Sequence, residues 1–479
     1  MRTKIIFPIV LIGLLACLYY FTLAPGLSWA NGGADGGDLI TAVAVNGVPH
    51  PTGYPLYLII AKLFQWLPIG NLAFRTNLLS AICTLWAAFL IYQTILHFKK
   101  EDEYGSVSAL SAALIFGLSP LVWSQAVITE VYGLQSLLTI GILYQTICSE
   151  NKPYNDFLRG LLLGLALGNH ITTIFLIPLL LGDKEKIHIS PMTNLITRFA
   201  GLLVGLSIYL ILPFRAMDHP AVNWFNPLTF KSFFQLVTGQ IYHSYFSTRN
   251  LITHAGAYVG LLIKNISIPG VVIGIYSLLD KDNHEWFKLL VAWVFVVYAL
   301  FALFYESYDS YVYLIQAILA FSLWIGLSFD KLIRYLINQW HNAGWILFPL
   351  LLLFFVSRIS STAPKINASN DNRAEIFAQT VFDTVPENAL LFTKDDRTTF
   401  TLWYFHYVDD MRSDTSIITE GLLNFDWYRQ TLQSNYPTLL IPETPDLAPF
   451  HLIYQNPDRP FCFIEYPETT KINCSRYKF

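Results

Sequence analysis

Long apolar segments alternate with short polar ones over residues 1–359. A bilayer crossing needs ~20 mostly apolar residues. Segments near this length occupy residues 5–23, 78–97, 107–123, 131–148, 195–214, 257–279, 287–305, 311–329 and 344–356. Residues 54–67 form a shorter apolar stretch that includes Lys62 and Gln65, which is typical of a helix lying in the membrane interface. The pattern predicts an α-helical polytopic membrane domain with one interfacial helix in its first outer loop, residues 24–77.

Residues 157–181 are long enough for one tilted span, but Gly168-Asn169-His170 interrupts them. Lys and Arg favour cytoplasmic loops. If the segment turns back at His170, one face receives Arg2 and Lys4 together with Lys99/Lys100, Lys152/Arg159, Lys184/Lys186/Arg198, Lys281/Lys288 and Lys331/Arg334. A single crossing would instead send the later groups to the other face. We therefore expect a hairpin, about eleven membrane helices, and a C-terminal segment outside the cytoplasm.

The composition supports a membrane protein. Hydrophobic residues make up 54% of the 479 residues and charged residues 13%, against roughly 25% charged residues in soluble proteins. The net charge of −3, with no basic cluster, argues against a nucleic-acid partner. The first apolar stretch exceeds a signal-peptide core of roughly 7–15 residues, so we expect it to remain as a helix.

Residues 360–479 are expected to form a small soluble α/β domain on the extracytoplasmic side. Helical patterns occupy residues 373–382, 398–407 and 427–433, and strand patterns occupy 389–392, 416–418, 451–454 and 461–466. Core packing and docking onto the membrane domain explain its many Tyr and Trp residues more readily than substrate binding. Cys462 and Cys474 lack the spacing of a zinc site, and the sequence leaves open whether they form a disulfide.

The loop after the first apolar segment carries Asp35 and Asp38. A carboxylate in a dry site can act as a general base toward a hydroxyl group. Asp35 is the stronger candidate, because Gly36 and Gly37 would allow the backbone to approach a substrate. The alternative is that Asp35 caps an interfacial helix. Asp38 would share a helix face with Asp35.

Further candidates follow along the chain. His50, between two prolines, can donate to a phosphate, bind a metal or serve as a structural hydrogen-bond partner. Glu130 can favour a helix start through the helix dipole, or it can join Asp35 in an acidic pair or a metal site. His170 would be an ionisable group at membrane depth, which is functional by default. Arg215 can bind a lipid-linked phosphate through its bidentate guanidinium, although snorkelling to the interface is an alternative.

We therefore predict two catalytic residues, Asp35 and Glu130. The predicted substrate-binding residues are Asp38, His50, Tyr54, Arg75, Tyr132, Asn169, His170, Arg215, Trp224, Tyr242 and His243.

Several strings resemble a known family. They are GGDLITAVAVNGVPHPTGYPLY, SPLVWSQAVITEVYGLQ, GLALGNHITT, LILPFRA with NWFNP, and LLFTKDDRTTFTLWYF with WYRQTL. Together they are similar to the DUF2723 membrane proteins, which are related to the transmembrane protein-260 O-mannosyltransferases in the GT-C glycosyltransferase superfamily. The resemblance implies a GT-C fold, a polyprenyl- or dolichyl-phosphate sugar donor, and inverting transfer to a hydroxyl group of a protein or glycan on the extracytoplasmic face. It implies that Asp35 is the base and that Glu130, His50 and His170 line the site.

Two other functions stay open at this point. A transporter or flippase of lipid-linked sugars would be expected to show repeated halves and broken helices. The activity of an assembly subunit would survive loss of the acidic residues on the outer face but not loss of the C-terminal tail. The sequence does not identify the sugar, the acceptor or any need for a divalent metal.

Overall fold

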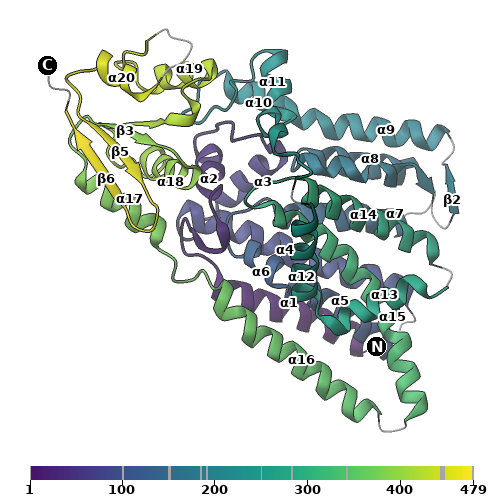
Figure 1. Ribbon diagram of the computed structural model, residues 1–479. Coiled ribbons are helices and arrows are strands. Elements are labelled where there is room, and N and C mark those ends of the chain that lie inside the picture. The colour runs from purple at the N-terminus through teal and green to yellow at the C-terminus, as the bar shows by residue number, and fades with distance from the viewer. Residues whose placement is uncertain are drawn as a thin grey trace.

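A computed structural model describes residues 2–99, 102–148, 153–183, 186–189, 192–249, 251–281, 284–340, 343–442 and 448–476. The described chain is mostly helical. Long helices run side by side, and a small sheet lies at one end of the bundle (Figure 1). Lys100, Lys152 and Lys184, which we assigned to the cytoplasmic face, lie outside the described residues.

The first part of the chain contains helices α1 (Arg2–Thr22), α2 (Gly36–Ala44), α3 (Pro55–Gln65), α4 (Leu72–Phe98), α5 (Glu103–Gly117), α6 (Pro120–Ala126), α7 (Tyr132–Cys148) and α8 (Pro153–Leu167). The following helices are α9 (Met192–Leu206), α10 (Ile211–Ala216), α11 (Phe230–Val237), α12 (Leu251–Ile266), α13 (Ile268–Leu279), α14 (Glu285–Phe304), α15 (Leu314–Gln339) and α16 (Ala343–Ile366). Short 3₁₀ helices are η1 (Ala30–Gly32), η2 (Ile171–Leu180), η3 (Ser207–Leu210), η4 (Gln240–Tyr245) and η5 (Ser310–Tyr313), and a strand pair consists of β1 (Gly182–Asp183) and β2 (Lys186–Ile189).

The bundle is that of an integral membrane protein. Within the described ranges, five helices are long and apolar enough to cross a bilayer, and two bent helix pairs raise the number to seven. Large apolar side chains such as Ile252, Phe214 and Leu353 are exposed on these helices, as expected where lipid replaces water. Our count of about eleven membrane helices stays a prediction.

Two segments that we expected to be single spans are bent. α5 and α6 meet at 65°, and α12 and α13 meet at 99°. The second helix of each pair begins with a proline in its first turn, which disfavours helical backbone in the residue before it. Asn265 links the two bends, because its side-chain oxygen accepts hydrogen bonds from the Ser119 hydroxyl at 2.7 Å and from the Leu121 N–H at 2.8 Å. Arg358 of α16 donates to the Asn265 carbonyl, so three helices meet at this point.

Residues 157–181 fold back on themselves, as the distribution of basic residues predicted. Arg159 near the start of α8 donates to the carbonyl of Leu179 near the end of η2, at 2.8 Å. The two arms therefore lie side by side, and His170 occupies the turn between them. The hairpin places this histidine at the end of the bundle that carries α2 and the sheet.

Glycines allow α8 to lie unusually close to α9. A Cβ at Gly160 would fall 1.8 Å from the carbonyl oxygen of Arg198, and one at Gly201 would fall 2.1 Å from that of Phe157. Small residues at such crossings let helix backbones approach within a membrane. This contact fixes the hairpin against α9.

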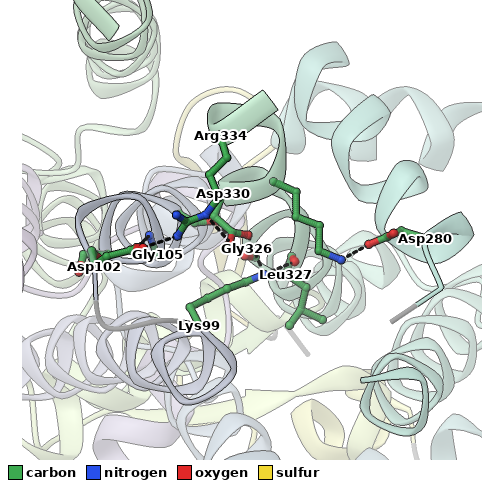
Figure 2. A network of polar contacts seen from close by, with 11 residues as sticks. Lys99, Asp102, Gly105, Asp280, Gly326, Leu327, Asp330 and Arg334 are labelled. Carbon is green, nitrogen blue, oxygen red and sulfur yellow. Dashed lines mark hydrogen bonds and ion pairs between the residues drawn. The ribbon is translucent and has the colours of Figure 1, made fainter. Parts of the chain in front are cut away.

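Ion pairs link helix ends at the end of the bundle away from the sheet, and Figure 2 shows these contacts from close by. They join the ends of α4, α5, α13 and α15 and consist of Lys99–Asp330, Arg334–Asp102 and Lys331–Asp280. Each of these basic residues belongs to the groups that we assigned to the cytoplasmic face, and each pairs with a carboxylate.

The C-terminal segment forms the small sheet. α16 runs on through Ile366, and after it come α17 (Arg373–Thr384), β3 (Leu390–Thr393), α18 (Asp396–Tyr407), β4 (Ser416–Thr419), η6 (Glu420–Leu422), α19 (Asp426–Asn435), α20 (Pro449–Gln455), β5 (Phe461–Glu465) and β6 (Lys471–Ser475). The strand order is β4-β3-β5-β6. β3 is parallel to β4 and β5, and β6 is antiparallel to β5.

The strand that we predicted at residues 451–454 is wrong, because these residues belong to helix α20. Pro449 opens the helix, and the Ala448 N–H donates to the ring of His451 at 3.1 Å, so local capping outweighs the strand-like pattern. The edge strand β6 was not predicted. A disulfide joins Cys462 to Cys474 across β5 and β6, which answers the question that the sequence left open.

Candidate active site

A cavity of about 740 Å³ lies at the sheet end of the bundle. Its walls come from segments far apart in sequence: the loop before α2, the loop before α3, the starts of α7 and η2, the η4 region, the loop before η5, and the start of α18. Of the predicted residues it is lined by Asp35, His50, Tyr54, Glu130, Tyr132, His170, Trp224, Tyr242 and His243. The structure thus brings most of the predicted site together.

Helix α2 is held in place at both ends. Lys62 of α3 donates to the carbonyls of Val43 and Ala44, each at 3.0 Å, where a cation complements the helix dipole. At the other end, a Cβ at Gly37 would lie 2.3 Å from the carbonyl oxygen of Phe400. We expected this glycine to admit a substrate, but it admits helix α18 instead, because the two backbones touch there.

Asp35 occupies the N-cap position of α2, but its side chain makes no capping hydrogen bond. The carboxylate faces His50 instead, with 3.6 Å between Asp35 Oδ2 and His50 Nε2, and the side chain is 35% exposed. Removal from bulk water raises the pKa of Asp35 to about 6, although the nearby His50 lowers it. Asp309 and Asp396 raise it further. Such a carboxylate is a proton acceptor poised near neutral pH.

Asp38 fixes the orientation of His50. Its side chain is fully buried; Oδ2 lies 2.6 Å from His50 Nδ1, and Oδ1 accepts from the Trp224 indole at 3.1 Å. His50 Nε2 therefore turns toward Asp35 and the Tyr54 hydroxyl, the latter at 3.1 Å. Burial lowers the pKa of His50, but the negative charges of Asp35 and Asp38 outweigh it and raise the pKa to about 9. This shift favours the imidazolium form of His50 at neutral pH.

Glu130 lies just before α7 and is buried at the cavity wall. Its backbone exchanges two hydrogen bonds with the Ser80 hydroxyl, at 3.0 and 3.1 Å. Burial raises the pKa of Glu130 well above its ordinary value, and the charges of Asp35 and Asp309 add to the shift. Burial thus favours the neutral form of this carboxyl group more than in an exposed glutamate, and a neutral carboxyl group can donate a hydrogen bond.

His170 lines the cavity. The Thr172 backbone N–H donates to His170 Nδ1 at 3.3 Å, so in the neutral ring the proton resides on Nε2. The rings of Tyr54, Tyr132 and Tyr313 surround the imidazole, with centroids 6.0, 6.0 and 5.7 Å away. Aromatic faces next to a fixed donor suit a sugar ring.

Four predicted residues do not line the cavity. Arg75 donates to three backbone carbonyls in the turn between α3 and α4, at 2.5 to 2.9 Å. Arg215 donates to the Gly47 carbonyl at 3.1 Å. Asn169 bonds the Val131 carbonyl at 3.3 Å, and Asp38 lies behind His50. These side chains hold the loops that carry the site.

Other residues of the cavity wall were not predicted. Asp309 belongs to the run YESYDSYVY, whose tyrosines between two apolar segments were a usable signal. Asp396, Arg397 and Phe400 come from α18, in the segment that we expected mainly to pack and dock. Phe400 stacks on His50 with 13° between the ring planes. Among the described residues, no group of three His, Cys, Asp or Glu side chains has the arrangement of a metal site.

The fold is similar to that of ArnT, a protein of known structure. ArnT from Cupriavidus metallidurans bound to undecaprenyl phosphate superposes with a TM-score of 0.58, covering 96% of this chain and 93% of that one at 10% identity. ArnT in the apo state gives 0.55 at 11% identity, with the same coverage. At such identities the likeness shows the fold alone.

Residues 35–182 match the family model described as the protein O-mannosyl-transferase TMEM260 N-terminal domain, and residues 374–444 match TMEM260-associated domain 2. Protein O-mannosyl-transferase TMEM260 of Mus musculus is 23% identical over 456 residues, which are 86% of this chain and 62% of that protein. The Dictyostelium discoideum protein of the same name is 23% identical over 477 residues, 86% and 57% of the two chains. The chain thus spans about 60% of the length of these relatives. The chain is thus similar to the TMEM260 proteins over most of its own length.

Proposed function

We propose that this protein transfers a sugar, with mannose the first to test, from a polyprenyl-phosphate donor to a hydroxyl group of a protein. The relatives in Mus musculus and Dictyostelium discoideum bear the name of this activity, and the ArnT structure contains undecaprenyl phosphate. One observation carries the proposal: Asp35, whose pKa is raised to about 6, faces a cavity lined by tyrosines and histidines.

Asp35 is the proposed base. It takes the proton of the acceptor hydroxyl while that oxygen attacks the anomeric carbon of the sugar. The bond from this carbon to the phosphate oxygen breaks, and the phosphate leaves with the bond's electron pair and the polyprenyl chain. A single in-line displacement inverts the anomeric carbon. His50 keeps Asp35 ionised within the cavity, because its positive charge opposes the effect of burial.

Glu130 and His170 are proposed to donate hydrogen bonds to the sugar or to the departing phosphate. Donors that are fixed before the reaction stabilise developing charge most effectively. We expected Arg215 near this phosphate, but it lies outside the cavity wall. Arg249 is the better candidate, since it lines a pocket of about 630 Å³ that shares Tyr245, Phe246 and Glu306 with the cavity. The lipid chain would enter through this pocket.

The site is proposed to face the extracytoplasmic side. The disulfide between Cys462 and Cys474 supports this orientation, because such bonds persist in oxidising compartments. The paired basic residues at the opposite end of the bundle fit a cytoplasmic face. Alkylation of intact cells with a membrane-impermeant thiol reagent tests it: a cysteine introduced at exposed Tyr308 should react, and one introduced at Tyr335 should not.

A direct test incubates the purified protein with a panel of polyprenyl-phosphate sugars and a threonine-containing peptide. The proposal expects consumption of one donor and a glycosylated peptide whose anomeric configuration, read by NMR, is opposite to that of the donor. Retention of configuration would contradict a single displacement. No product with any sugar would contradict the proposed reaction.

A transporter of lipid-linked sugars is the second candidate. The two bent helix pairs favour it, since broken helices are common in transporters. In a transporter, however, polar groups should form a path across the membrane. In this protein the polar groups of the cavity lie at one end of the bundle. Movement of a labelled lipid-linked sugar across proteoliposomes without any acceptor would support this function over the first.

A further inference from the structure

Helix α18 places Arg397 at the wall of the cavity. The guanidinium carbon lies 5.3 Å from the ring centroid of Trp29 and 5.9 Å from that of Tyr466. Trp29 is itself fixed, because its indole N–H donates to the Thr401 hydroxyl at 2.9 Å and its backbone N–H to Asp371 at 2.8 Å. Two rings from opposite ends of the chain therefore hold the Arg397 side chain.

Two of the nearby carboxylates, those of Asp395 and Asp371, are engaged elsewhere. Asp395 caps α18 by accepting from the Thr398 backbone at 3.0 Å and from its hydroxyl at 2.9 Å. Asp371 pairs with Arg373 at 2.6 Å. Over the part of the chain that the structure describes, Arg397 has no ion pair within 4.0 Å. A guanidinium stacked on aromatic faces keeps its planar N–H fork available for an oxyanion.

The position of Arg397 favours the acceptor over the donor. The lipid-linked donor would enter beside Arg249, through the pocket between η4 and the end of α14. Arg397 instead belongs to the segment that carries the sheet, which lies beyond the long helices (Figure 1). Arg397 and Asp35 line the same cavity, so one acceptor chain can contact both.

We propose that Arg397 binds a carboxylate of the acceptor, and that the protein therefore selects acidic peptides. The assignment rests on the proposed transfer to a protein hydroxyl. A carboxylate fits because the guanidinium fork matches its two oxygens. Arg397 is thus a specificity-determining residue, and it takes no part in proton transfer.

The test uses synthetic peptides with one threonine, in which a single glutamate is moved through the flanking positions, each paired with its glutamine counterpart. The donor is a polyprenyl-phosphate mannose. The wild-type protein should prefer the glutamate peptide at one or more positions by about tenfold in kcat/KM. Arg397→Gln should bring this ratio close to one, and Arg397→Glu should shift the preference toward lysine at the same position.

Lys394→Gln is the matched control. Lys394 precedes the same helix, pairs with Glu465 at 3.0 Å and lies outside the cavity, so this variant should retain the preference. Thermal unfolding establishes that each variant is folded, and Arg397→Lys, which keeps the charge without the fork, should give an intermediate ratio. Equal rates for both peptides with the wild type, or a preference that survives in Arg397→Gln, would overturn the role of Arg397 but not the proposed transfer reaction. No transfer to any peptide would overturn the proposed protein acceptor as well.

Discussion

Replacing His50 tests whether its charge keeps Asp35 ionised. The ring nitrogen lies 3.6 Å from the carboxylate. Because Asp35 is about one-third exposed, an effective dielectric constant of about 40–80 is appropriate, and Coulomb's law then gives about 1–2 kcal/mol. One pKa unit corresponds to about 1.4 kcal/mol. His50→Gln should therefore raise the pKa of Asp35 from about 6 to about 7.

The assay is the pH dependence of kcat/KM for sugar transfer, which reports the ionisation of the free enzyme. Asp35 must be ionised to act as a base, so the wild-type rate should fall as the pH drops through about 6. In His50→Gln this fall should begin at higher pH. His219→Gln, an exposed histidine outside the cavity, should leave the profile unchanged. An acidic limb that stays in place or moves down in His50→Gln would refute the reasoning, provided thermal unfolding shows a folded variant.

Three further outcomes are expected. Asp396→Asn removes a negative charge that raises the pKa of Asp35, so the acidic limb should move to lower pH; a move upward would contradict this. Gly160→Ala forces a Cβ against the backbone of α9 and should lower stability by about 1–3 kcal/mol, seen as a lower unfolding temperature in detergent. A Cβ at Gly141 would have no atom within 4 Å, so Gly141→Ala should not lower the unfolding temperature. Equal unfolding temperatures for the two variants would contradict the packing argument. Replacing Cys462 and Cys474 by serine should cost about 2–3 kcal/mol on denaturant unfolding of the protein, and unchanged stability would contradict a structural role for the bond.

The apolar pattern predicted the helical bundle because a lipid bilayer requires each spanning segment to be helical, long and apolar. Every backbone polar group within a bilayer must be satisfied locally, so spanning segments are long and apolar. The hairpin at His170 followed from the distribution of basic residues and is confirmed by the contact of Arg159 with Leu179. The stretch at residues 54–67 forms the helix α3, and its place in the membrane interface stays a prediction. These features depend on local sequence and on its relation to the membrane.

The bends at Ser119 and Ser267 could not be predicted with the same rules. Hydropathy runs through both breaks, and a distant residue, Asn265, binds the hydroxyl group at the first of them. The strand predicted at residues 451–454 failed for the opposite reason, because a local cap at Ala448 decided its conformation.

The candidate site was predicted where chemistry stands out in the local sequence. Asp35, His50, Glu130 and His170 combine ionisable groups with apolar surroundings, and all four line one cavity. Asp396 stood out less, because it sits in a polar segment where charge is ordinary. The packing of α18 on α2 at Gly37 brings Asp396 to the site. A local sequence pattern does not predict such a long-range contact.

The central claim is that Asp35 is the base of a sugar transferase. The most direct measurement compares single-turnover transfer from polyprenyl-phosphate mannose by the wild type, by Asp35→Asn and by Asp458→Asn, whose exposed carboxylate lies outside the cavity. General-base catalysis contributes about 10²–10⁴-fold, so Asp35→Asn should lose at least about a hundredfold while Asp458→Asn keeps the wild-type rate and both retain the wild-type unfolding temperature. A folded Asp35→Asn protein that transfers mannose at a near-normal rate would contradict the account.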